Sequence, residues 1–329
     1  MIKTSPEARQ ILQILKSHNI QSLWHFTDIR NLPLIKKLNG LRSKEFLEKR
    51  GYLTSVSVYC GGNEISHNLD RELGNWDKVS LNFTPYTPMA YHIKKEKHLV
   101  FIEIDISVAT FEGVFFTDCN ATRLRNGQKR EKGISGLNNV KFQYIHSQPK
   151  PYDADWQKFV QAEILVPDHI PLDYFKKIHF ISEASLQLGQ YLWGTNEDLF
   201  SVSPQVFSDY NYSQGWVVLN PYVESVIITH QEVTKNNVNN NHIKSEIVEK
   251  EKDFWIKISL FATAGTEGKI ILKTLNDKII DQTETSFEKE SKWWWYPNFG
   301  IPLDYKYSSF IIEIFLEKVL WYKSRWRVT

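Results

Sequence analysis

The sequence predicts two regions of different fold class, an α+β region at residues 1–221 and an all-β, sandwich-like region at residues 222–329. Helical and strand-like hydrophobic patterns alternate over the first 200 residues, which is typical of α+β proteins. Beyond Pro221, short alternating stretches follow one another with turn residues between them, as in antiparallel sandwiches. The length of 329 residues also suits two domains of ~150 residues each.

The N-terminal region is expected to begin with a helix and a strand. Ser5-Pro6-Glu7 offers a cap, a first-turn proline and an acidic first turn, so a helix is expected to follow as far as Leu15. Residues 22–26 alternate between apolar and polar side chains, which predicts a strand. A short helix from Asn31 should end before Gly40, because glycine commonly follows a helix C-terminus.

Further elements follow from the same patterns. Three strands are expected at residues 79–83, 99–106 and 159–166, and a helix at residues 184–192. In the C-terminal region, strands are expected at residues 223–233, 254–262, 269–275, 309–315 and 319–328. The Asn-rich segment 235–242 is expected to be a loop.

The composition is that of a globular protein and identifies no function. The chain is 42% hydrophobic and 24% charged, and its net charge of +2 gives no bulk basic character. Two cysteines, Cys60 and Cys119, cannot make a disulfide framework, so a reducing, cytoplasmic location is expected. No apolar stretch is long enough to cross a membrane, and polar residues within 1–16 argue against a signal peptide.

Residues 159–166 carry a polar pair in an otherwise apolar strand pattern. Side chains alternate faces along a strand, so Gln161 and Glu163 share one face and the apolar residues between them share the other. The polar face is either a solvated outer surface or the wall of a wet cleft. In a cleft, a carboxylate beside an amide could hold a sugar hydroxyl and stabilise a nearby cation.

Three other polar residues each have a bland interpretation and a functional one. His25 stands among apolar neighbours and is either a satisfied core residue or a ligand-binding group. Asn82 precedes a turn with Pro85 and Pro88, where turn chemistry alone is a sufficient explanation. Arg71 is by default a solvated charge on a helix. None of these residues indicates a function by itself.

Together, however, these residues fall into four ordered blocks. The blocks are residues 24–41 with Trp24-His25-Phe26-Thr27, Asn31-Leu32 and Gly40-Leu41, residues 79–89 from Val79 to Met89, residues 117–121, and residues 161–167. This order resembles the DarT family of bacterial toxins, which ADP-ribosylate bases of single-stranded DNA with NAD. The resemblance covers roughly residues 22–193, and it implies an ADP-ribosyltransferase-like mixed sheet with helices for the N-terminal region.

The resemblance also implies roles for individual residues. It makes Glu163 the catalytic glutamate, which binds a ribose hydroxyl and stabilises an oxocarbenium-like transition state. It makes Arg71 a second catalytic residue, with Arg50 as the alternative. The residues implied to bind NAD are His25, Thr27, Asn31, Leu41, Asn82 and Gln161. NAD is the co-substrate, and the reaction needs no metal.

A basic segment before the last block is the expected binding site for the acceptor. Residues 123–132 contain five basic residues and one acidic residue, and aromatic residues follow. Basic groups for phosphates and aromatic faces for bases are the features of single-strand binding, although a solvated loop is an equal interpretation without the resemblance. The residues implied to bind nucleic acid are Arg123, Arg125, Lys129, Arg130, Tyr144 and Trp156.

The chain departs from the family near the acceptor side. Cys119 replaces a glycine that the family tends to carry, and Lys158 stands alone where a basic run is usual. We expect transfer to a base of single-stranded DNA, with RNA or protein as alternative acceptors and a catalytically dead nucleic-acid-binding protein as a third interpretation. The resemblance implies a toxin of a toxin–antitoxin or anti-phage system, with an ADP-ribosyl-removing macrodomain protein as its antitoxin and no membrane partner.

Tryptophan is concentrated in the C-terminal region, which the resemblance does not cover. Adjacent Trp293 and Trp294 must face opposite sides if they lie on a strand, so at least one of them lies off the core. Structural packing and a binding surface are both open interpretations, and this region is therefore an accessory domain of unknown role.

Overall fold

The computed structural model describes residues 3–53, 64–93, 98–123, 130–147, 153–195, 198–207, 221–229, 232–233, 247–248, 255–289, 291–295, 297 and 309–327. Tertiary contacts divide the chain into two compact units. The first unit consists of Met1–Ile181 with Leu192–Val218, and the second consists of Ser182–Tyr191 with Leu219–Thr329. The second unit therefore includes a segment that precedes the domain boundary predicted at Pro221, and that boundary stays a prediction.

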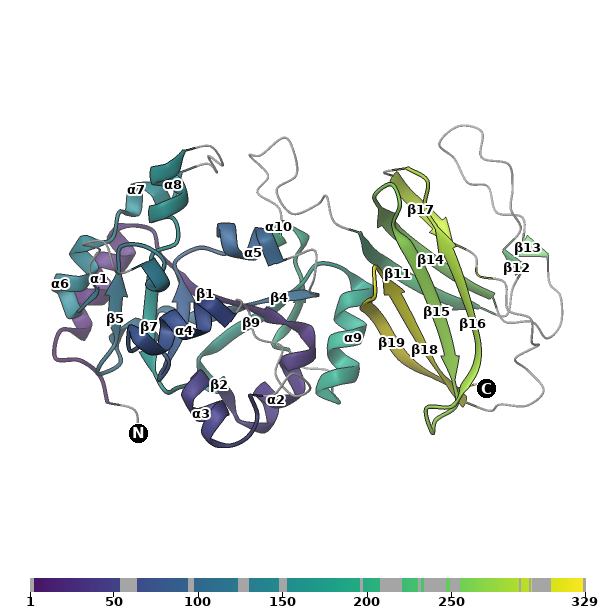
Figure 1. Ribbon diagram of the computed structural model, residues 1–329, viewed down its shortest axis with the longest axis horizontal. Helices are drawn as coiled ribbons and strands as arrows, with labels where there is room; N and C mark the ends of the chain where they lie inside the picture. The colour runs from purple at the N-terminus through teal and green to yellow at the C-terminus, as the bar shows by residue number, and fades with distance from the viewer. Residues whose placement is uncertain are drawn as a thin grey trace. The chain divides into compact units, whose positions relative to one another are not determined.

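The first unit is built on an eight-stranded mixed sheet with surrounding helices (Figure 1). The strands are, in sheet order, β10 (Phe200–Val202), β9 (Phe175–Phe180), β4 (Leu99–Asp105), β1 (Ser22–Asp28), β3 (Lys78–Asn82), β7 (Glu163–Pro167), β5 (Phe115–Thr117) and β6 (Arg130–Lys132). The pair β10–β9 is parallel, and the other pairs are antiparallel. A separate pair joins β2 (Gly40–Arg42) to β8 (His169–Pro171). The predicted α+β class with a mixed sheet is confirmed.

Short helices connect the strands of this unit. The α-helices are α1 (Ala8–Ser17), α2 (Leu32–Lys37), α3 (Lys44–Lys49), α4 (Glu64–Glu72), α5 (Pro88–Ile93), α6 (Gly133–Asn139), α7 (Phe142–Ile145), α8 (Ala154–Phe159) and α10 (Pro204–Phe207), whereas most of α9 (Glu183–Trp193) belongs to the second unit. Single 3-10 turns are η1 (Ile29–Asn31), η2 (Ile106–Thr110), η3 (Ala121–Arg123) and η4 (Leu172–Tyr174). The central strands carry fully buried Leu23, Ile102 and Ile164, so the hydrophobic core lies against the middle of the sheet.

The first helix begins later than the sequence predicted. Helix α1 starts at Ala8, with Glu7 as its N-cap residue and no side-chain cap bond. The Ser5 N–H instead donates to the Thr110 carbonyl at 2.7 Å, which keeps this residue in the connection rather than at the helix cap. The Glu7 carboxylate accepts from the Ile134 N–H at 3.1 Å, so it fastens α1 to α6.

The strand predicted at residues 159–166 is wrong in its first half. Residues up to Phe159 form helix α8, and strand β7 begins only at Glu163. The reason is a local cap, because the Asp153 side chain accepts from the N–H groups of Asp155 and Trp156 and starts the helix. Gln161 therefore lies in the turn between the helix and the strand rather than on the strand.

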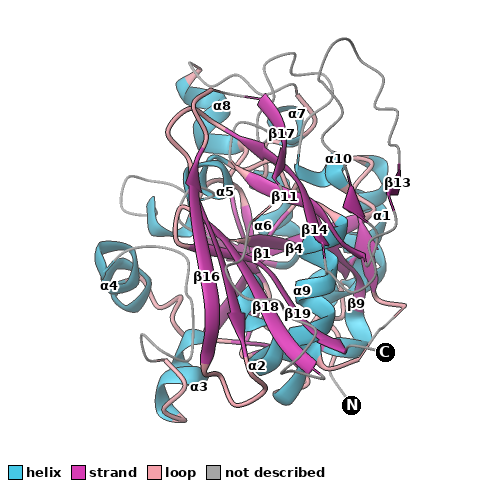
Figure 2. Ribbon diagram, turned by 90° about the vertical axis from the view of Figure 1, so that its right-hand side faces the viewer, coloured by secondary structure: helices cyan, strands magenta, loops and turns pink. Residues whose placement is uncertain are grey.

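The second unit is antiparallel β structure, as predicted (Figure 2). One sheet has the order β11 (Tyr222–Thr229), β14 (Trp255–Ala262), β17 (Ser291–Trp295), and a second has the order β16 (Ile279–Ser286), β15 (Glu267–Lys273), β18 (Ser309–Leu316), β19 (Val319–Arg327). A short pair joins β12 (Glu232–Val233) to β13 (Ile247–Val248). The loop expected at residues 235–242 lies outside the described residues.

Tryptophan serves both packing and surface roles in this unit. Phe287 packs against Trp293 and Trp295, with ring centroids 5.6 and 6.0 Å apart. Trp294 lies between them in sequence and is 40% exposed, with the Lys257 ammonium 4.0 Å from its ring centroid. Adjacent tryptophans of β17 thus differ in environment, as the alternation of side chains along a strand requires.

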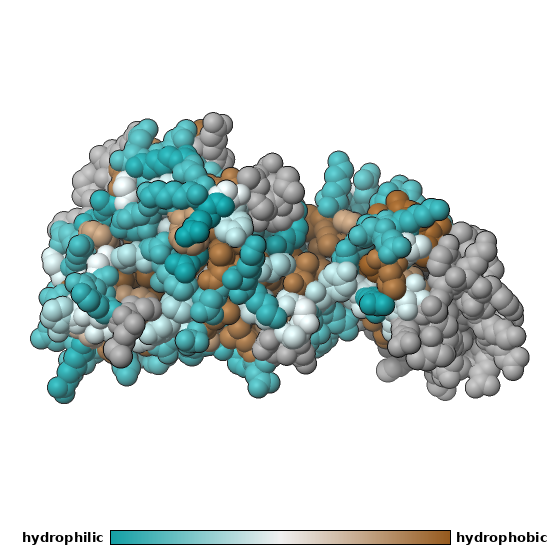
Figure 3. All heavy atoms as spheres, turned by 90° about the horizontal axis from the view of Figure 1, so that it is seen from below, coloured by the Kyte–Doolittle hydropathy of each residue, from teal (hydrophilic) through white to brown (hydrophobic). Residues whose placement is uncertain are grey.

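Hydrophilic residues cover much of the surface seen in Figure 3, with hydrophobic residues exposed in patches between them. Among the described residues, no helix combines the length and the apolar character that a membrane crossing needs.

Candidate active site

One cavity of the first unit collects polar side chains from stretches that are far apart in the sequence. Its walls come from β1, α2, β2, the beginning of α3, α4, β3, and the turns that follow β5 and α8. Glu163 and every residue that the resemblance assigned to NAD line this cavity, namely His25, Thr27, Asn31, Leu41, Asn82 and Gln161. A polar wall of this kind, backed by buried strands, is typical of ligand sites.

Glu163 is the first residue of β7 and is held there by its backbone. Its N–H donates to the Thr117 hydroxyl at 2.9 Å, and that hydroxyl donates in turn to the Cys119 carbonyl at 2.6 Å. On the neighbouring strand β3, Asn82 stands directly opposite Glu163. Only 7% of Glu163 is exposed, so the carboxyl group sits in the wall of the cavity and not on an open surface.

The surroundings of Glu163 favour its neutral form. Burial raises its pKa to about 8, and the nearby Asp70 carboxylate raises it as well. Hydrogen bonds from the Ala121 N–H and the Ser80 hydroxyl, and the Lys44 ammonium, act in the opposite direction. The raised pKa favours the protonated form of Glu163 near neutral pH, and a cation bound beside it would favour release of the proton.

His25 is a neutral hydrogen-bonding group. Burial is the main cause that lowers its pKa, and Lys44 lowers it further, against a hydrogen bond with the Ser80 carbonyl that raises it. His25 Nδ1 lies 3.1 Å from that carbonyl oxygen, which can only accept a hydrogen bond. Nδ1 must therefore carry the hydrogen, and Nε2 is left as an acceptor for a hydroxyl group.

The end of β1 fixes two further polar residues. The Asn31 amide donates to the Thr27 hydroxyl at 2.8 Å across the short turn η1. Asp28, only 1% exposed, starts this turn by accepting from the Arg30 N–H, and it also pairs with the Arg30 guanidinium at 2.7 Å. This turn holds Thr27 and Asn31 against the cavity.

Lys44 and Asp70 line the same cavity and were not predicted as site residues. The Lys44 ammonium is 2.8 Å from the Asp70 carboxylate and lies 5.3 Å from the centroid of the Trp76 ring. A local conflict could have indicated Lys44. It occupies the first turn of α3 after the N-cap Ser43, where the helix dipole disfavours a cation. Such conflicts tend to mark functional sites.

Arg71 is placed differently from the other predicted catalytic residue. It does not line the cavity, and its guanidinium pairs with Glu48 at 2.8 Å and stacks 3.9 Å from the centroid of the Trp76 ring. Glu48 also accepts from the Trp76 indole N–H at 2.8 Å. These contacts tie α4 to α3, and the catalytic role of Arg71 stays a prediction. Arg50, the alternative, lies 5.6 Å from the Phe46 ring centroid and is likewise absent from the lining.

Five of the six predicted nucleic-acid-binding residues divide into three groups. Arg125 and Lys129 lie outside the described residues. Arg123 is exposed at the end of η3, and Tyr144 is half-buried beside Phe159 with ring centroids 5.3 Å apart. Trp156 is 1% exposed, which corrects the base-stacking role expected for it, because its ring packs in the interior with Val160.

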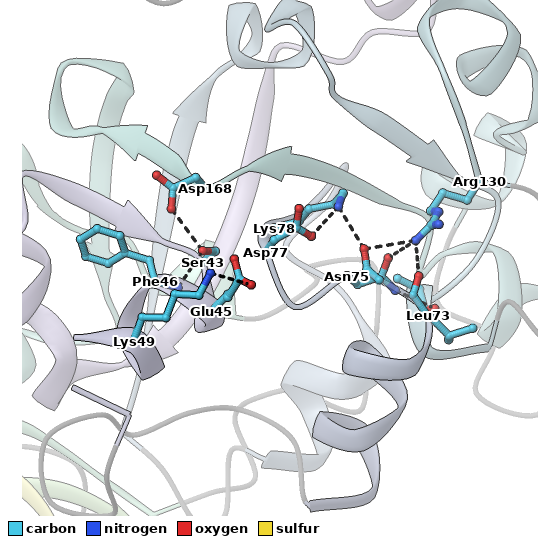
Figure 4. Close-up of polar contacts among 12 residues, drawn as sticks. Ser43, Glu45, Phe46, Lys49, Leu73, Asn75, Asp77, Lys78, Arg130 and Asp168 are labelled. Carbon is cyan, nitrogen blue, oxygen red and sulfur yellow. Dashed lines mark hydrogen bonds and ion pairs between the residues drawn. The ribbon is translucent and has the colours of Figure 1, made fainter. Parts of the chain in front are cut away.

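Arg130 makes structural contacts that the sequence did not predict. Its guanidinium donates to the Leu73 carbonyl at 2.5 Å and to the Asn75 side-chain oxygen at 2.6 Å (Figure 4). It also lies 5.3 Å from the Phe115 ring centroid. Arg130 thus fastens β6 to the loop that follows α4, and its part in nucleic-acid binding stays a prediction.

Cys119, the residue that departs from the family pattern, is buried and chemically quiet. Its thiol is fully buried, and burial raises its pKa to about 12, so it is not a nucleophile near neutral pH. Within the described residues, no group of three or more His, Cys, Asp or Glu side chains is placed to hold a metal ion. The expectation that no metal is needed stays a prediction.

Comparisons with known proteins indicate the family. A family model described as DarT, ssDNA thymidine ADP-ribosyltransferase, matches residues 24–207. No curated protein matches the chain. Among solved structures, Thermosipho africanus DarTG in complex with ADP-ribose is 20% identical with a TM-score of 0.45, over 57% of this chain and 51% of that chain. Thermus sp. 2.9 DarT in complex with NAD+ is 15% identical with a TM-score of 0.43, over 57% of this chain and 97% of that chain. The match thus spans about half the length of the Thermosipho chain.

Proposed function

Because the chain belongs to the DarT family, we propose that it transfers ADP-ribose from NAD to a thymidine of single-stranded DNA. The observation that carries this proposal is the convergence of His25, Asn82 and Glu163 on one cavity. These residues come from different strands, and a sheet face exposed only to solvent would not need them to meet. The family match also confirms the resemblance on which their roles were predicted.

The residues of the cavity suit a dinucleotide. His25 Nε2 is an acceptor for a ribose hydroxyl, and the Thr27–Asn31 pair offers an amide and a hydroxyl to the nicotinamide side. Arg42 lines the cavity, and its Nη1 pairs with the Asp168 carboxylate at 3.0 Å. Its Nε is buried without a hydrogen-bond partner among the described residues, so this donor remains for an anionic phosphate.

Glu163 would act on the ribose as the bond to nicotinamide breaks. The nicotinamide ring of NAD is a cation, and a cation beside Glu163 favours the ionised carboxylate over the neutral form that burial imposes. The carboxylate then holds a ribose hydroxyl and stabilises the positive charge that develops on the sugar. NAD binding would thereby switch on the charge that the reaction needs.

The biological setting is proposed on the same family basis. We expect the chain to act as a toxin in a toxin–antitoxin or anti-phage system, with an ADP-ribosyl-removing macrodomain protein as its antitoxin. Expression of the wild type in a bacterial host should slow growth, whereas Glu163→Ala should relieve this effect. Equal toxicity of the two proteins would contradict a role for ADP-ribosyl transfer in toxicity.

A labelling experiment tests the biochemical proposal. The full chain is incubated with NAD labelled in the adenylate and, separately, with single-stranded DNA containing or lacking thymidine, with RNA, and with a protein mixture. Label should appear on the thymidine-containing strand, and Glu163→Gln should reduce it by about 10²–10³-fold. Label only on RNA or only on protein would show that single-stranded DNA is not the acceptor. A wild type that labels nothing would contradict the proposed ADP-ribosyl transfer itself.

A further inference from the structure

We propose that Asp70 accepts the proton that the thymine ring nitrogen loses when it attacks the ribose. This inference rests on the proposed function and adds to it a residue that the sequence did not indicate. It is carried by the position of Asp70 in the cavity, by its ion pair with Lys44, and by the direction of its neighbour Arg71.

The chemistry requires such a group. In thymidine N1 carries the deoxyribose, so the remaining ring nitrogen is N3, which bears a weakly acidic hydrogen. The N3–H bond breaks and its electron pair forms the new bond to the anomeric carbon. The bond from that carbon to nicotinamide breaks, and its electron pair leaves with nicotinamide, which becomes neutral. The remaining proton needs an acceptor of suitable geometry.

Asp70 is the available carboxylate. Among the described residues that line the cavity, the carboxyl groups are those of Asp70 and Glu163. Burial raises the pKa of Glu163 to about 8, which favours its protonated form, and in the proposed reaction its carboxylate is occupied by the ribose. Both groups line the same cavity, and the Asp70 carboxylate contributes to the raised pKa of Glu163.

Lys44 fixes the position of Asp70 for this role. The ammonium and the carboxylate are 2.8 Å apart, with side-chain exposures of 29% and 16%. Lys44 also lies 5.3 Å from the Trp76 ring centroid. When Asp70 takes up a proton, the ammonium therefore retains a favourable contact with the ring face.

The geometry of α4 separates Asp70 from Arg71. Successive residues of a helix point about 100° apart, so neighbours do not share one face. Asp70 lines the cavity, whereas Arg71 lies against Trp76 and Glu48. This helix thus presents to the cavity an acceptor of protons and not the guanidinium that the resemblance implied.

The test compares Asp70→Asn with a matched control, Glu45→Gln. Glu45 also pairs with a lysine, at 2.9 Å from Lys49, and neither residue lines the cavity. Transfer from labelled NAD to a thymidine-containing strand is measured across a range of pH, together with NAD affinity by calorimetry. Asp70→Asn should lower transfer by about 10²-fold or more near neutral pH while NAD affinity changes less than about threefold. The control should transfer like the wild type.

The pH profile and the acceptor separate proton acceptance from a merely structural role. Transfer by Asp70→Asn should rise about tenfold for each pH unit, because only thymine that has already lost its proton reacts. Two further acceptor strands carry deoxyuridine or 5-fluorodeoxyuridine in place of thymidine. The fluorine makes N3 more acidic, so the change from deoxyuridine to 5-fluorodeoxyuridine should speed transfer by the variant far more than transfer by the wild type. Asp70→Glu retains a carboxylate and should keep the wild-type pH profile. Together with the acceptor comparison, this variant distinguishes loss of the proton acceptor from poor folding of Asp70→Asn.

Three results would overturn the inference. The first is Asp70→Asn with transfer within about threefold of wild type. The second is a reduced rate with an unchanged pH profile and no response to 5-fluorodeoxyuridine, which would make Asp70 a positioning residue. The third is Asp70→Glu that behaves like Asp70→Asn. A wild type that labels no acceptor at all contradicts the proposed function first, and the role of Asp70 with it.

Discussion

Asn82 and Glu163 lie directly opposite each other on the antiparallel strands β3 and β7. Side chains in such positions project from the same face with Cβ atoms ~4.5–5.5 Å apart. An amide and a carboxyl group are therefore presented together to the cavity that both residues line. The register of the sheet fixes this relationship, and a site built on paired strands is more rigid than one built on loops.

The first prediction concerns the stability of Glu163→Gln. Burial raises the pKa of Glu163 from 4.5 to about 8 in the folded state. The folded protein thus holds a proton that the unfolded chain releases, so the stability that this group contributes below pH 4.5 is lost as the pH rises towards 8. The glutamine keeps the neutral form throughout. Thermal unfolding measured from about pH 5 to pH 9 should show a higher Tm for the variant than for the wild type. This difference in Tm should grow with pH, by ~2–4 °C for each kcal/mol of stability that the wild type loses. An advantage that does not change with pH would contradict the buried, protonated carboxyl.

The second prediction concerns His25. His25→Phe removes the Nε2 acceptor and leaves a ring of similar size, so binding of a ribose hydroxyl should weaken by about tenfold, as expected for one lost hydrogen bond. His25→Gln retains an acceptor and should lose less. The KM for NAD, measured with saturating DNA, checks this order. If both variants bind NAD like the wild type, His25 is a core residue and not a ligand-binding group.

The third prediction separates two arginines that the resemblance placed in one group. Arg130→Ala leaves the Leu73 carbonyl and the Asn75 amide oxygen without a partner, so it should lower the free energy of unfolding by about 1–3 kcal/mol. Exposed Arg123→Ala should leave Tm unchanged and should weaken binding of single-stranded DNA, with a salt dependence smaller by ~0.7 in slope. Denaturation and DNA titrations at several salt concentrations measure both effects. Identical behaviour of the two variants would contradict this division.

The fourth prediction concerns the stability of the first unit at acidic pH. A hydrogen bond with His179 is the largest cause that lowers the pKa of Glu103 to about 2, with further help from Lys176 and Ser22 against the effect of burial. Its contribution to stability is present above the ordinary carboxyl pKa of 4.5 and is lost as the pH falls towards 2. Glu103→Gln should therefore lower Tm near neutral pH, and the deficit should disappear in strong acid.

Glu45→Gln serves as the control for this measurement. Glu45 pairs with Lys49 at 2.9 Å on an exposed helix, where an ion pair contributes only ~0–1 kcal/mol. Its Tm should follow the wild type across the same pH range. A deficit of Glu103→Gln that persists unchanged at about pH 2 would indicate lost packing rather than a lost charge.

The sequence predicted the residues of the cavity wall better than the ion pair between Lys44 and Asp70 within the cavity. His25, Asn82 and Glu163 belong to local strand and turn patterns that form recognisable blocks, and the family match at residues 24–207 confirms those blocks. Lys44 and Asp70 are separated by 26 residues and belong to helices whose pairing depends on tertiary structure. No local pattern predicts that contact, although an unfavourable lysine in the first turn of α3 was a signal.

Burial was the second property that local patterns failed to predict. Trp156 follows a basic segment, and composition alone cannot distinguish an exposed stacking ring from one that fills the core. The pattern at residues 159–166 fitted a strand, but the Asp153 cap starts a helix that runs to Phe159, and a turn follows it before the strand begins at Glu163. Tertiary packing decided the first case, and the hydrogen bonds of the Asp153 cap decided the second.

Helix α9 has a practical consequence for any dissection of this protein. Residues Ser182–Tyr191 belong to the second compact unit, yet they fall inside the stretch that matches the family. Within that unit, the Ser182 hydroxyl donates to the Val223 carbonyl at 2.6 Å, and the Lys323 ammonium lies 5.3 Å from the Tyr191 ring centroid. A fragment that starts at residue 222 would lose both contacts, and a single cut in the gene cannot separate the stretch that matches the family from the second unit.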